Sequence, residues 1–437
     1  MNVLTGTPLL PTYARFPVTF VDGEGSWLIA DDGQRYLDLV SGIAVVSLGH
    51  CHPAPLEAAK AQLERLWHVS NLYSTEPMEN LARLLSERFG GAHAFFCNSG
   101  TEAVEAAIKI SRAATGRPRV LYAEHAFHGL TLGSLSINGN AEFRDGFGPL
   151  LDGCDPVGFG DIDALERELA RGDVAAFVVE PVQGKGVNLP AADYLPGAQR
   201  LCRAAGAMFV CDEVQTGIGR TGRFLALEHW DLQPDLICLA KALSGGLVPI
   251  GATLVSRWAF DRVFDGMERA VRHGSTFGGN DLAAAAALAT LGVLDREGHD
   301  ARSERMCELL LELTRPLVDR YEVVTDVRGL GLMWAIEFGP PSGAVALRLW
   351  DAVETRQPGL FSQLITVPLF HDHHILCQVA GHHMNVIKAL PALTIEESEI
   401  RRFAAALEET IAAAERYPSA LARFGLRTGS RAARIRR

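Results

Sequence analysis

The chain has 437 residues, of which 48% are hydrophobic and 21% charged, a composition typical of folded globular proteins rather than disordered ones. A chain of this length is too long for one small hydrophobic core, so two closely packed domains are expected within the subunit. The net charge of −11 and the pI near 5.7 argue against nucleic acid and anionic membranes as partners.

The eight cysteines have no paired spacing, which indicates free thiols in a reducing cytoplasm. The longest apolar run, Leu282 to Leu294, is too short to span a bilayer, and no basic stretch leads into an apolar one at the N-terminus. We therefore expect a cytoplasmic protein with no membrane partner. The basic tail from Arg423 to Arg437 is expected to be a solvated C-terminus.

In chain order, the first predicted helix has apolar residues at helical spacing between Leu56 and Leu66, after an extended N-terminal segment. Between about residues 90 and 260, short apolar runs alternate with helical stretches. This alternation predicts an α/β fold with a mostly parallel sheet covered by helices on both faces. The apolar runs are 94–97, 120–123, 174–179, 208–211, 236–239 and 250–255.

The pattern changes after about residue 300. It predicts an amphipathic helix over 308–318, a strand over 332–338, a longer irregular stretch, and a final helix over 396–414. These elements are typical of a smaller α+β domain. The predicted division is 1–60 for an N-terminal segment of the small domain, 61–305 for the large domain and 306–437 for the C-terminal part of the small domain.

The first candidate binding feature is a strand that runs into a helix around residues 95–102. Ser99 and Glu102 form a capping-box pattern, so the free amides of the first helical turn, with Thr101, can bind an anion such as phosphate. Many ordinary helices begin with such a cap, so this feature alone leaves a purely structural role open.

Two charged residues follow predicted strands. Asp212 ends the strand 208–211, at the sheet edge where α/β proteins bind ligands, while Glu213 is expected to point elsewhere. Lys241 follows the strand 236–239 and precedes small residues, where its amine can be desolvated and become an imine-forming nucleophile. An anion site, a buried aspartate and such a lysine together are what pyridoxal 5′-phosphate (PLP) requires.

With these motifs the chain resembles the fold-type I, class III aminotransferases, a group that includes ornithine and acetylornithine aminotransferases. The resemblance runs from about Asp38 to Ile395. It implies a large PLP-binding domain with a mostly parallel sheet and a smaller α+β domain formed by both chain ends. It also implies a homodimer with shared active sites, because Thr276 matches a threonine that reaches the phosphate of the neighbouring subunit.

By the same resemblance, Lys241 forms a Schiff base with PLP and moves the proton during transamination, and Asp212 binds the pyridine nitrogen. The other cofactor positions that the resemblance assigns are Ser99, Gly100 and Thr101 at the phosphate, Phe127 and Val214 on the two ring faces, Gln215 at the phenolic oxygen, and His128 and Glu180 in the adjoining motifs.

Three positions depart from the family where its members bind substrate carboxylates. Leu130 stands in place of an arginine, Lys185 in place of a glutamate, and Lys388 in place of another arginine. Neither lysine nor leucine reproduces the bidentate clamp of arginine on a carboxylate. This favours a terminal amine donor, such as a diamine, an ω-amino compound or an apolar amine, with a keto acid or aldehyde acceptor.

Several alternatives stay open. Lys388 can still bind a carboxylate as a point charge, which keeps acetylornithine and ornithine as candidate donors, and a PLP aminomutase has the same motifs. Ile43 and Val45 belong to the stretch that borders the family's substrate pocket. The insertion 360–377 can either accommodate an apolar donor or pack in the core. The histidines fit no zinc pattern, so no metal is expected; they are His371, His373, His374, His382 and His383.

Overall fold

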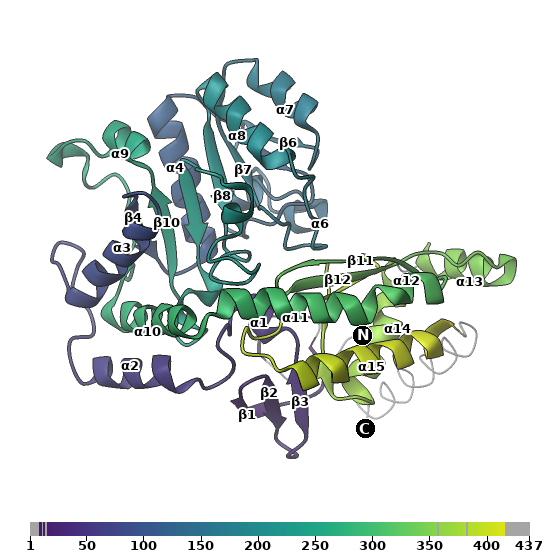
Figure 1. The fold of residues 1–437 in the computed structure, drawn as a ribbon. Helices are drawn as coiled ribbons and strands as arrows, with labels where there is room; N and C mark the ends of the chain where they lie inside the picture. Colours follow the sequence, from purple (N-terminus) through teal and green to yellow (C-terminus); the bar gives the residue numbers. More distant parts are fainter. Residues whose placement is uncertain (1–7, 11, 14, 356–357, 382, 416–437) are drawn as a thin grey trace.

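The structure is a computed structural model that describes residues 8–415 apart from 11, 14, 356–357 and 382 (Figure 1). His382 and the basic tail at 423–437 lie outside the described residues. None of the described helices is long and apolar enough to cross a membrane. All eight cysteines are free thiols, and the described part of the chain contains no group of three or more His, Cys, Asp or Glu side chains arranged to hold a metal ion.

A seven-stranded sheet forms the larger part of the molecule. Its strand β10 runs antiparallel to both of its neighbours, and all other neighbouring strands are parallel. This confirms the predicted α/β fold with a mostly parallel sheet. In spatial order the strands are β4 (His93–Cys97), β10 (Gly251–Val255), β9 (Leu236–Leu239), β8 (Met208–Asp212), β7 (Val174–Val179), β5 (Arg119–Ala123) and β6 (Cys154–Val157).

Helices cover both faces of this sheet (Figure 1). Alternate residues of a strand point to opposite faces, so Val178 packs with the helices of one face and Phe177 with those of the other. That is why the central strands are continuous apolar runs. The helices of this part are α4 (Gly100–Thr115) and α9 (Arg257–Val263) on one face, α7 (Ile162–Leu169) and α8 (Tyr194–Ala205) on the other, and the short α5 (Leu132–Ser136) and α6 (Ala141–Arg144).

Two four-stranded sheets lie outside this large sheet. β13 pairs in parallel with β3, so segments from both chain ends meet in one sheet, as expected for the smaller part of the fold. The boundaries at residues 60 and 305 stay a prediction. One sheet is β1 (Phe20–Glu24), β2 (Trp27–Ala30), β3 (Arg35–Asp38) and β13 (Ile375–Leu376); the other is β11 (Val324–Leu330), β12 (Met333–Phe338), β15 (Val386–Ala389) and β14 (Gln378–Val379).

Two predicted helices differ from the structure. The first begins at Pro53, because the ring of His52 caps it by accepting the Ala54 N–H. The predicted helix 308–318 is two helices, because Pro316 has no N–H to continue the first and starts the second. The helices are α1 (Ser41–Ala44), α2 (Pro53–Leu63), α3 (Glu76–Arg88), α10 (Asp281–Glu297), α11 (His299–Thr314), α12 (Pro316–Arg320), α15 (Glu397–Glu415), and the 3-10 helices η1 (Ala226–Trp230), η2 (Lys241–Ser244) and η3 (Met267–Arg269).

The expectation of a long irregular stretch after residue 338 is wrong. Helices α13 (Ala344–Glu354) and α14 (Leu360–His371) occupy much of it, and Pro368 lies inside α14. The apolar residues of the insertion 360–377 pack in the core, where Leu369 and Ile375 are fully buried. The insertion therefore stabilises the fold instead of lining the cavity described below.

Candidate active site

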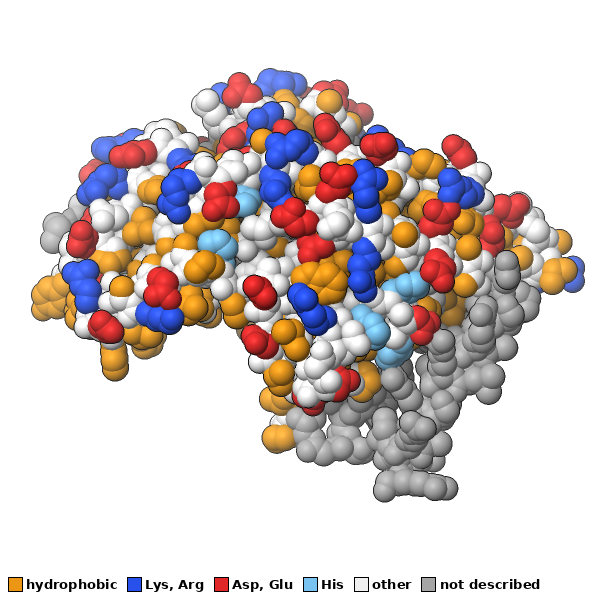
Figure 2. All heavy atoms as spheres, turned by 60° about the horizontal axis from the view of Figure 1, so that its bottom comes forward, with side chains coloured by type: hydrophobic (Ala, Val, Ile, Leu, Met, Phe, Trp, Pro, Cys, Tyr) orange, Lys and Arg blue, Asp and Glu red, His pale blue; other side chains and the backbone are white. Residues whose placement is uncertain are grey.

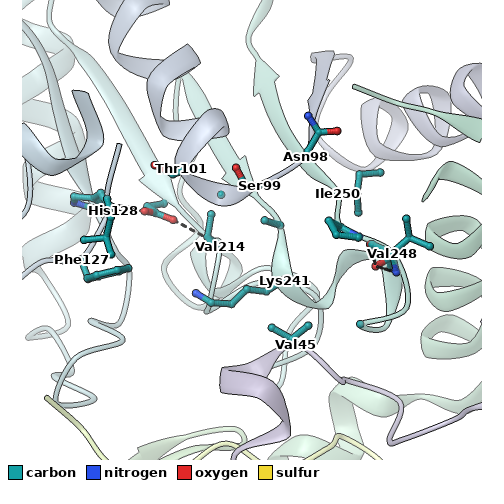
Figure 3. A pocket seen from close by; sticks show the side chains of 18 residues that line it. Val45, Asn98, Ser99, Thr101, Phe127, His128, Val214, Lys241, Val248 and Ile250 are labelled. Atoms are coloured by element: carbon teal, nitrogen blue, oxygen red, sulfur yellow. Dashed lines mark hydrogen bonds and ion pairs between the residues drawn. The ribbon is translucent and has the colours of Figure 1, made fainter. Parts of the chain in front are cut away.

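A cavity of about 470 Å³ opens where β4, β8 and β9 end (Figure 3). Predicted site residues that line it are Val45, Ser99, Gly100, Thr101, Phe127, His128, Leu130, Asp212, Val214 and Lys241. Predicted site residues that the structure places outside this lining are Ile43, Glu180, Lys185, Gln215, Thr276 and Lys388.

The N-terminus of α4 forms one end of the cavity. The Ser99 hydroxyl accepts a hydrogen bond from the Glu102 N–H at 3.3 Å, and the Glu102 carboxylate accepts one from the Asn98 N–H at 3.0 Å. This is the predicted capping arrangement, with the return bond at Asn98 instead of Ser99. The remaining free N–H groups and the dipole of this 16-residue helix favour a bound anion.

Glycines allow the close packing around this anion site. A Cβ atom on Gly100 would lie 2.7 Å from Val214 Cγ1, and one on Gly129 would lie 2.4 Å from Thr101 Oγ1. Neither distance is sterically possible for a side chain. The Thr101 hydroxyl also lies 2.7 Å from the Thr131 hydroxyl, so the cavity end presents both backbone N–H groups and hydroxyl groups. This donor set fits a phosphate.

Asp212 lies at the end of β8 and is almost fully buried. Its Oδ2 is 2.7 Å from Nδ1 of His128, and its Oδ1 accepts the Val214 N–H at 3.0 Å. Burial alone would lower the pKa of His128, but the hydrogen bond and the charge of Asp212 raise it. The Asp212 carboxylate lines the cavity, where a protonated ring nitrogen can approach it. Glu213 points away from the cavity, as expected, and accepts hydrogen bonds from the backbone N–H groups of Ala226 and Leu227.

Lys241 follows β9 and begins η2 with a φ of 41°, a backbone conformation that non-glycine residues seldom adopt. In Figure 3 its side chain lies between Val214 and Val45. Burial lowers the pKa of its amine, although the charges of Asp212 and Glu180 act in the opposite direction. More of the amine is then neutral, which is the form that attacks a carbonyl carbon.

Glu180 and Gln215 are not among the residues that line the cavity. The Glu180 carboxylate accepts the N–H groups of Phe127 at 3.0 Å and Gly184 at 2.8 Å, so it fixes the loop that carries Phe127. Its burial raises its pKa. Oε1 of Gln215 is buried without a hydrogen-bond partner in the described part of the chain. Because a glutamine amide can be flipped, this end of the side chain can present an N–H to a ligand oxygen.

Two of the three positions that depart from the family are not arranged as carboxylate clamps. Leu130 lines the cavity with 54% of its surface exposed. Lys185 forms an ion pair with Glu142 and donates a hydrogen bond to Asn140 Oδ1 at 2.6 Å. The charge of Lys185 is therefore already paired outside the cavity lining.

Lys388, on β15, is buried and donates a hydrogen bond from Nζ to the carbonyl oxygen of Gly184 at 2.8 Å. Burial, and then repulsion by Lys241, lowers its pKa to about 7, against the attraction of Glu180. At neutral pH only part of the Lys388 population is charged. Such a group attracts a carboxylate less strongly than an arginine does.

Thr276 is exposed and lies outside the cavity. The hydroxyl of its neighbour Ser275 accepts a hydrogen bond from Asn98 Nδ2 at 2.9 Å and donates one to Glu102 at 3.2 Å. The loop around Thr276 is thus attached to the anion site of its own subunit, while the Thr276 side chain faces outward.

Several lining residues were not assigned from the sequence. Val248, Pro249 and Ile250 directly precede β10, which runs antiparallel to its neighbours. The N-terminal end of β10 therefore lies at the sheet edge where the other strands end. The connection over residues 240–250 is short for the crossover that two parallel strands need. This length indicates from the sequence that β10 runs antiparallel to β9. The unassigned lining residues are Asn98, Gly129, Ala240, Ser244, Gly246, Val248, Pro249 and Ile250.

Comparison with known proteins agrees with this geometry. A family model described as aminotransferase class-III matches residues 11–411. An acetylornithine aminotransferase of Methanopyrus kandleri is 47% identical over 331 residues, which cover 75% of this chain and 82% of that protein. Acetylornithine aminotransferase 1 of Bradyrhizobium diazoefficiens is 41% identical over 414 residues, 93% of this chain and 95% of that protein.

Solved structures are similar over nearly the whole chain. Ornithine aminotransferase from Toxoplasma gondii superposes with a TM-score of 0.84 at 32% identity, covering 94% of this chain and 93% of its own. A PLP-bound amine transaminase from an uncultivated Pseudomonas species gives a TM-score of 0.85 at 31% identity, covering 94% of this chain and all of its own.

Proposed function

This chain belongs to the class III aminotransferases, which use PLP, and from that premise we propose that its donor is an amine whose binding requires no carboxylate. Candidate donors are diamines, ω-amino compounds and amines related to apolar aldehydes. The amino group passes to a keto acid or an aldehyde. When bound, PLP supplies a ring that accepts electrons while the amino group is exchanged.

The residues around the cavity have distinct parts in this proposal. The N-terminus of α4 binds the phosphate, and the Asp212 carboxylate holds a positive charge at the ring nitrogen. The amine of Lys241 would hold the cofactor covalently and, once the donor amine has displaced it, would take the proton from the donor carbon that bears nitrogen. The other residues proposed to contact the cofactor are Ser99, Gly100, Thr101, Phe127, His128, Val214 and Gln215, and Glu180 is proposed to act on the cofactor through the loop that carries Phe127.

One observation carries the donor proposal: no arginine is among the cavity-lining residues in the described part of the chain. Leu130 is in the lining, while Lys185 is paired with Glu142 and Lys388 donates to a backbone carbonyl. A carboxylate on the donor would thus lack the bidentate partner that arginine supplies. A donor without a carboxylate loses nothing by this arrangement.

We expect an alkylamine or a diamine to react faster than N-acetylornithine in the first half-reaction. The measurement is the ratio of the two rate constants, followed through the cofactor absorbance. Restoring arginine with Leu130→Arg and Lys388→Arg together should lower this ratio roughly 10- to 100-fold, because a bidentate pair with a carboxylate contributes about 1.5 to 3 kcal/mol.

Lys185→Arg is a matched control for these variants. It should leave the ratio unchanged, because Lys185 is paired outside the cavity. A wild-type ratio well below one would mean that the lysines bind carboxylates as arginines do. The donor proposal would then be abandoned.

The second candidate is an acetylornithine- or ornithine-type aminotransferase. It is favoured by the 38–47% identity to acetylornithine aminotransferases. The same rate ratio decides between the two donor classes. Transfer is favoured over the isomerisation of an aminomutase because the relatives named above are aminotransferases; turnover that needs no external acceptor would reverse this preference.

We also propose that two chains form a dimer with shared sites. The eight free thiols support a location in a reducing cytoplasm. Leu66, Trp67 and Leu72 are 48%, 69% and 82% exposed. Hydrophobic side chains gather at the lower left of Figure 2, the side on which α2 lies in Figure 1. The ring of His68 packs on Phe277 at 4.7 Å, so this apolar surface continues beside Thr276.

Thr276→Ala should weaken PLP binding by about 1 to 3 kcal/mol, the effect of losing a hydrogen bond to a charged group. Mixing this variant with Lys241→Ala should give hybrid dimers in which one site has both lesions and the other has none. At a PLP concentration that loads only wild-type sites, such hybrids should regain activity. Thr276→Ser, which keeps the hydroxyl, should bind PLP as the wild type does.

If hybrids with verified subunit exchange regain no activity under these conditions, Thr276 does not act across an interface. The proposal of shared sites would then fail, while the assignment of Lys241 would be unaffected.

A further inference from the structure

The short element α1 has an unusual backbone. Its four residues all have positive φ angles: 45° at Ser41, 66° at Gly42, 67° at Ile43 and 62° at Ala44. Left-handed backbone is unfavourable for L-residues, and for β-branched Ile43 it is a rare outlier. Contacts with the surrounding structure must therefore impose this conformation.

Asp38 and His50 supply the contacts at the start of α1. Oδ1 of Asp38, the last residue of β3, accepts the N–H groups of Val40 at 2.8 Å and Ser41 at 2.9 Å. Oδ2 of Asp38 is 2.8 Å from Nε2 of His50. The backbone of His50 is itself paired with Gly25 in both directions. A buried carboxylate, fixed by a histidine, thus holds the first residues of α1.

The far end of α1 leads directly into the cavity wall. Val45 lines the cavity and lies beside Lys241 in Figure 3. Val46 packs so closely on Gly246 that a Cβ atom there would lie 3.0 Å from Val46 Cγ2. The Ser47 hydroxyl reaches the carbonyl oxygen of Ala242 at 3.4 Å. The turn therefore determines where the wall stands relative to the reacting amine.

We propose that Asp38 and His50 are positioning residues that set how large a group the site accepts beside the reacting carbon. They hold α1 in its left-handed conformation, and α1 holds Val45 on the Lys241 side of the cavity. The inference rests on the proposed function only because an amine donor must enter this cavity. Neither Asp38 nor His50 is among the residues that line the cavity.

The test compares pairs of donors that differ in bulk at the carbon bearing the amine. One pair is butylamine and sec-butylamine, and the other is 5-aminopentanoate and 5-aminohexanoate, which carry a carboxylate. His50→Leu should raise the branched-to-linear ratio of half-reaction rates roughly fivefold or more, since one methyl group in a pocket changes rates about tenfold or more. Val45→Ala should shift the ratio in the same direction.

Two controls separate positioning from general damage. His50→Gln can still donate to Asp38 and should keep the wild-type ratio. His52→Leu removes the histidine that caps α2 and should also keep the wild-type ratio. Thermal unfolding and cofactor absorbance verify that each variant is folded and loaded. If His50→Leu does not fold, Asp38→Ala, which removes the acceptor of the Val40 and Ser41 N–H groups, takes its place and should shift the ratio in the same direction.

If His50→Leu slows all donors equally, the proposal is overturned. It is also overturned if the branched-to-linear ratio rises in Val45→Ala but keeps its wild-type value in His50→Leu. An unchanged ratio in Val45→Ala would overturn the role of the wall. If the wild type converts only the carboxylate-bearing pair, the proposed donor class is wrong, and the size test is read from that pair alone.

Discussion

Lys241→Ala should lose transamination by roughly 10³-fold or more, because it removes both the amine that binds the cofactor and the group that moves the proton. The protein should still fold and bind PLP without a covalent bond, since the N-terminus of α4 and Asp212 are unchanged. Single-turnover half-reactions, followed by cofactor absorbance, measure the loss. Borohydride should fix the cofactor to the peptide containing Lys241 in the wild type and to no peptide in the variant.

Lys388→Ala is the matched control, because Lys388 is a second buried lysine with a lowered pKa. It should alter the choice of donor or acceptor much more than the loading of PLP. Wild-type turnover in Lys241→Ala, or covalent loading at Lys388, would refute the assignment of the reactive lysine.

Asp212→Asn should reduce the half-reaction rate by roughly 10²- to 10³-fold, because a neutral amide cannot hold a positive charge at the ring nitrogen. The variant should also lower the pKa of His128, which Asp212 keeps above its ordinary value. A raised histidine pKa stabilises the fold fully at low pH, and this stabilisation is lost as the pH rises through the raised pKa. Asp212→Asn should flatten that part of the stability profile.

Glu213→Gln tests whether the location of the charge matters. Glu213 is the adjacent buried carboxyl, but it faces backbone N–H groups away from the cavity. Burial raises the pKa of Glu213 to about 7, so only part of the Glu213 population is charged at neutral pH. We expect Glu213→Gln to change stability more than rate. Equal rate losses in the two variants would contradict the role of Asp212.

The fold was predictable where burial on both faces leaves continuous apolar runs, as in β7 and β8. It was not predictable where long-range packing overrides local preference. Pro368 in α14 predicts a break in the helix, yet packing around Phe361 and Leu369 keeps this segment helical. Strand β6, with its Pro156 and Asp155, has little strand propensity and depends on its pairing with β5.

The site was predictable where motifs put side chains at strand ends, as with Asp212 and Lys241. It was less so where a partner distant in the sequence decides what a side chain does. That Lys185 is paired with Glu142, and that Lys388 donates to Gly184, follows only from how the loops fold together. Gln215 and Glu180 illustrate a further limit, because a motif does not tell whether a residue lines a cavity or supports its wall.

The meeting of the two chain ends affects the order in which the molecule forms during synthesis. The hydrogen bond from Ser41 Oγ to the carbonyl oxygen of Leu390 joins residues 349 positions apart, and β3 gains its second neighbour only when residues 375–376 have been made. Until then β3 presents an open edge to other chains. The nascent polypeptide therefore carries a strand with one unpaired edge through most of its translation, and the wall beside Lys241 is completed only near the end.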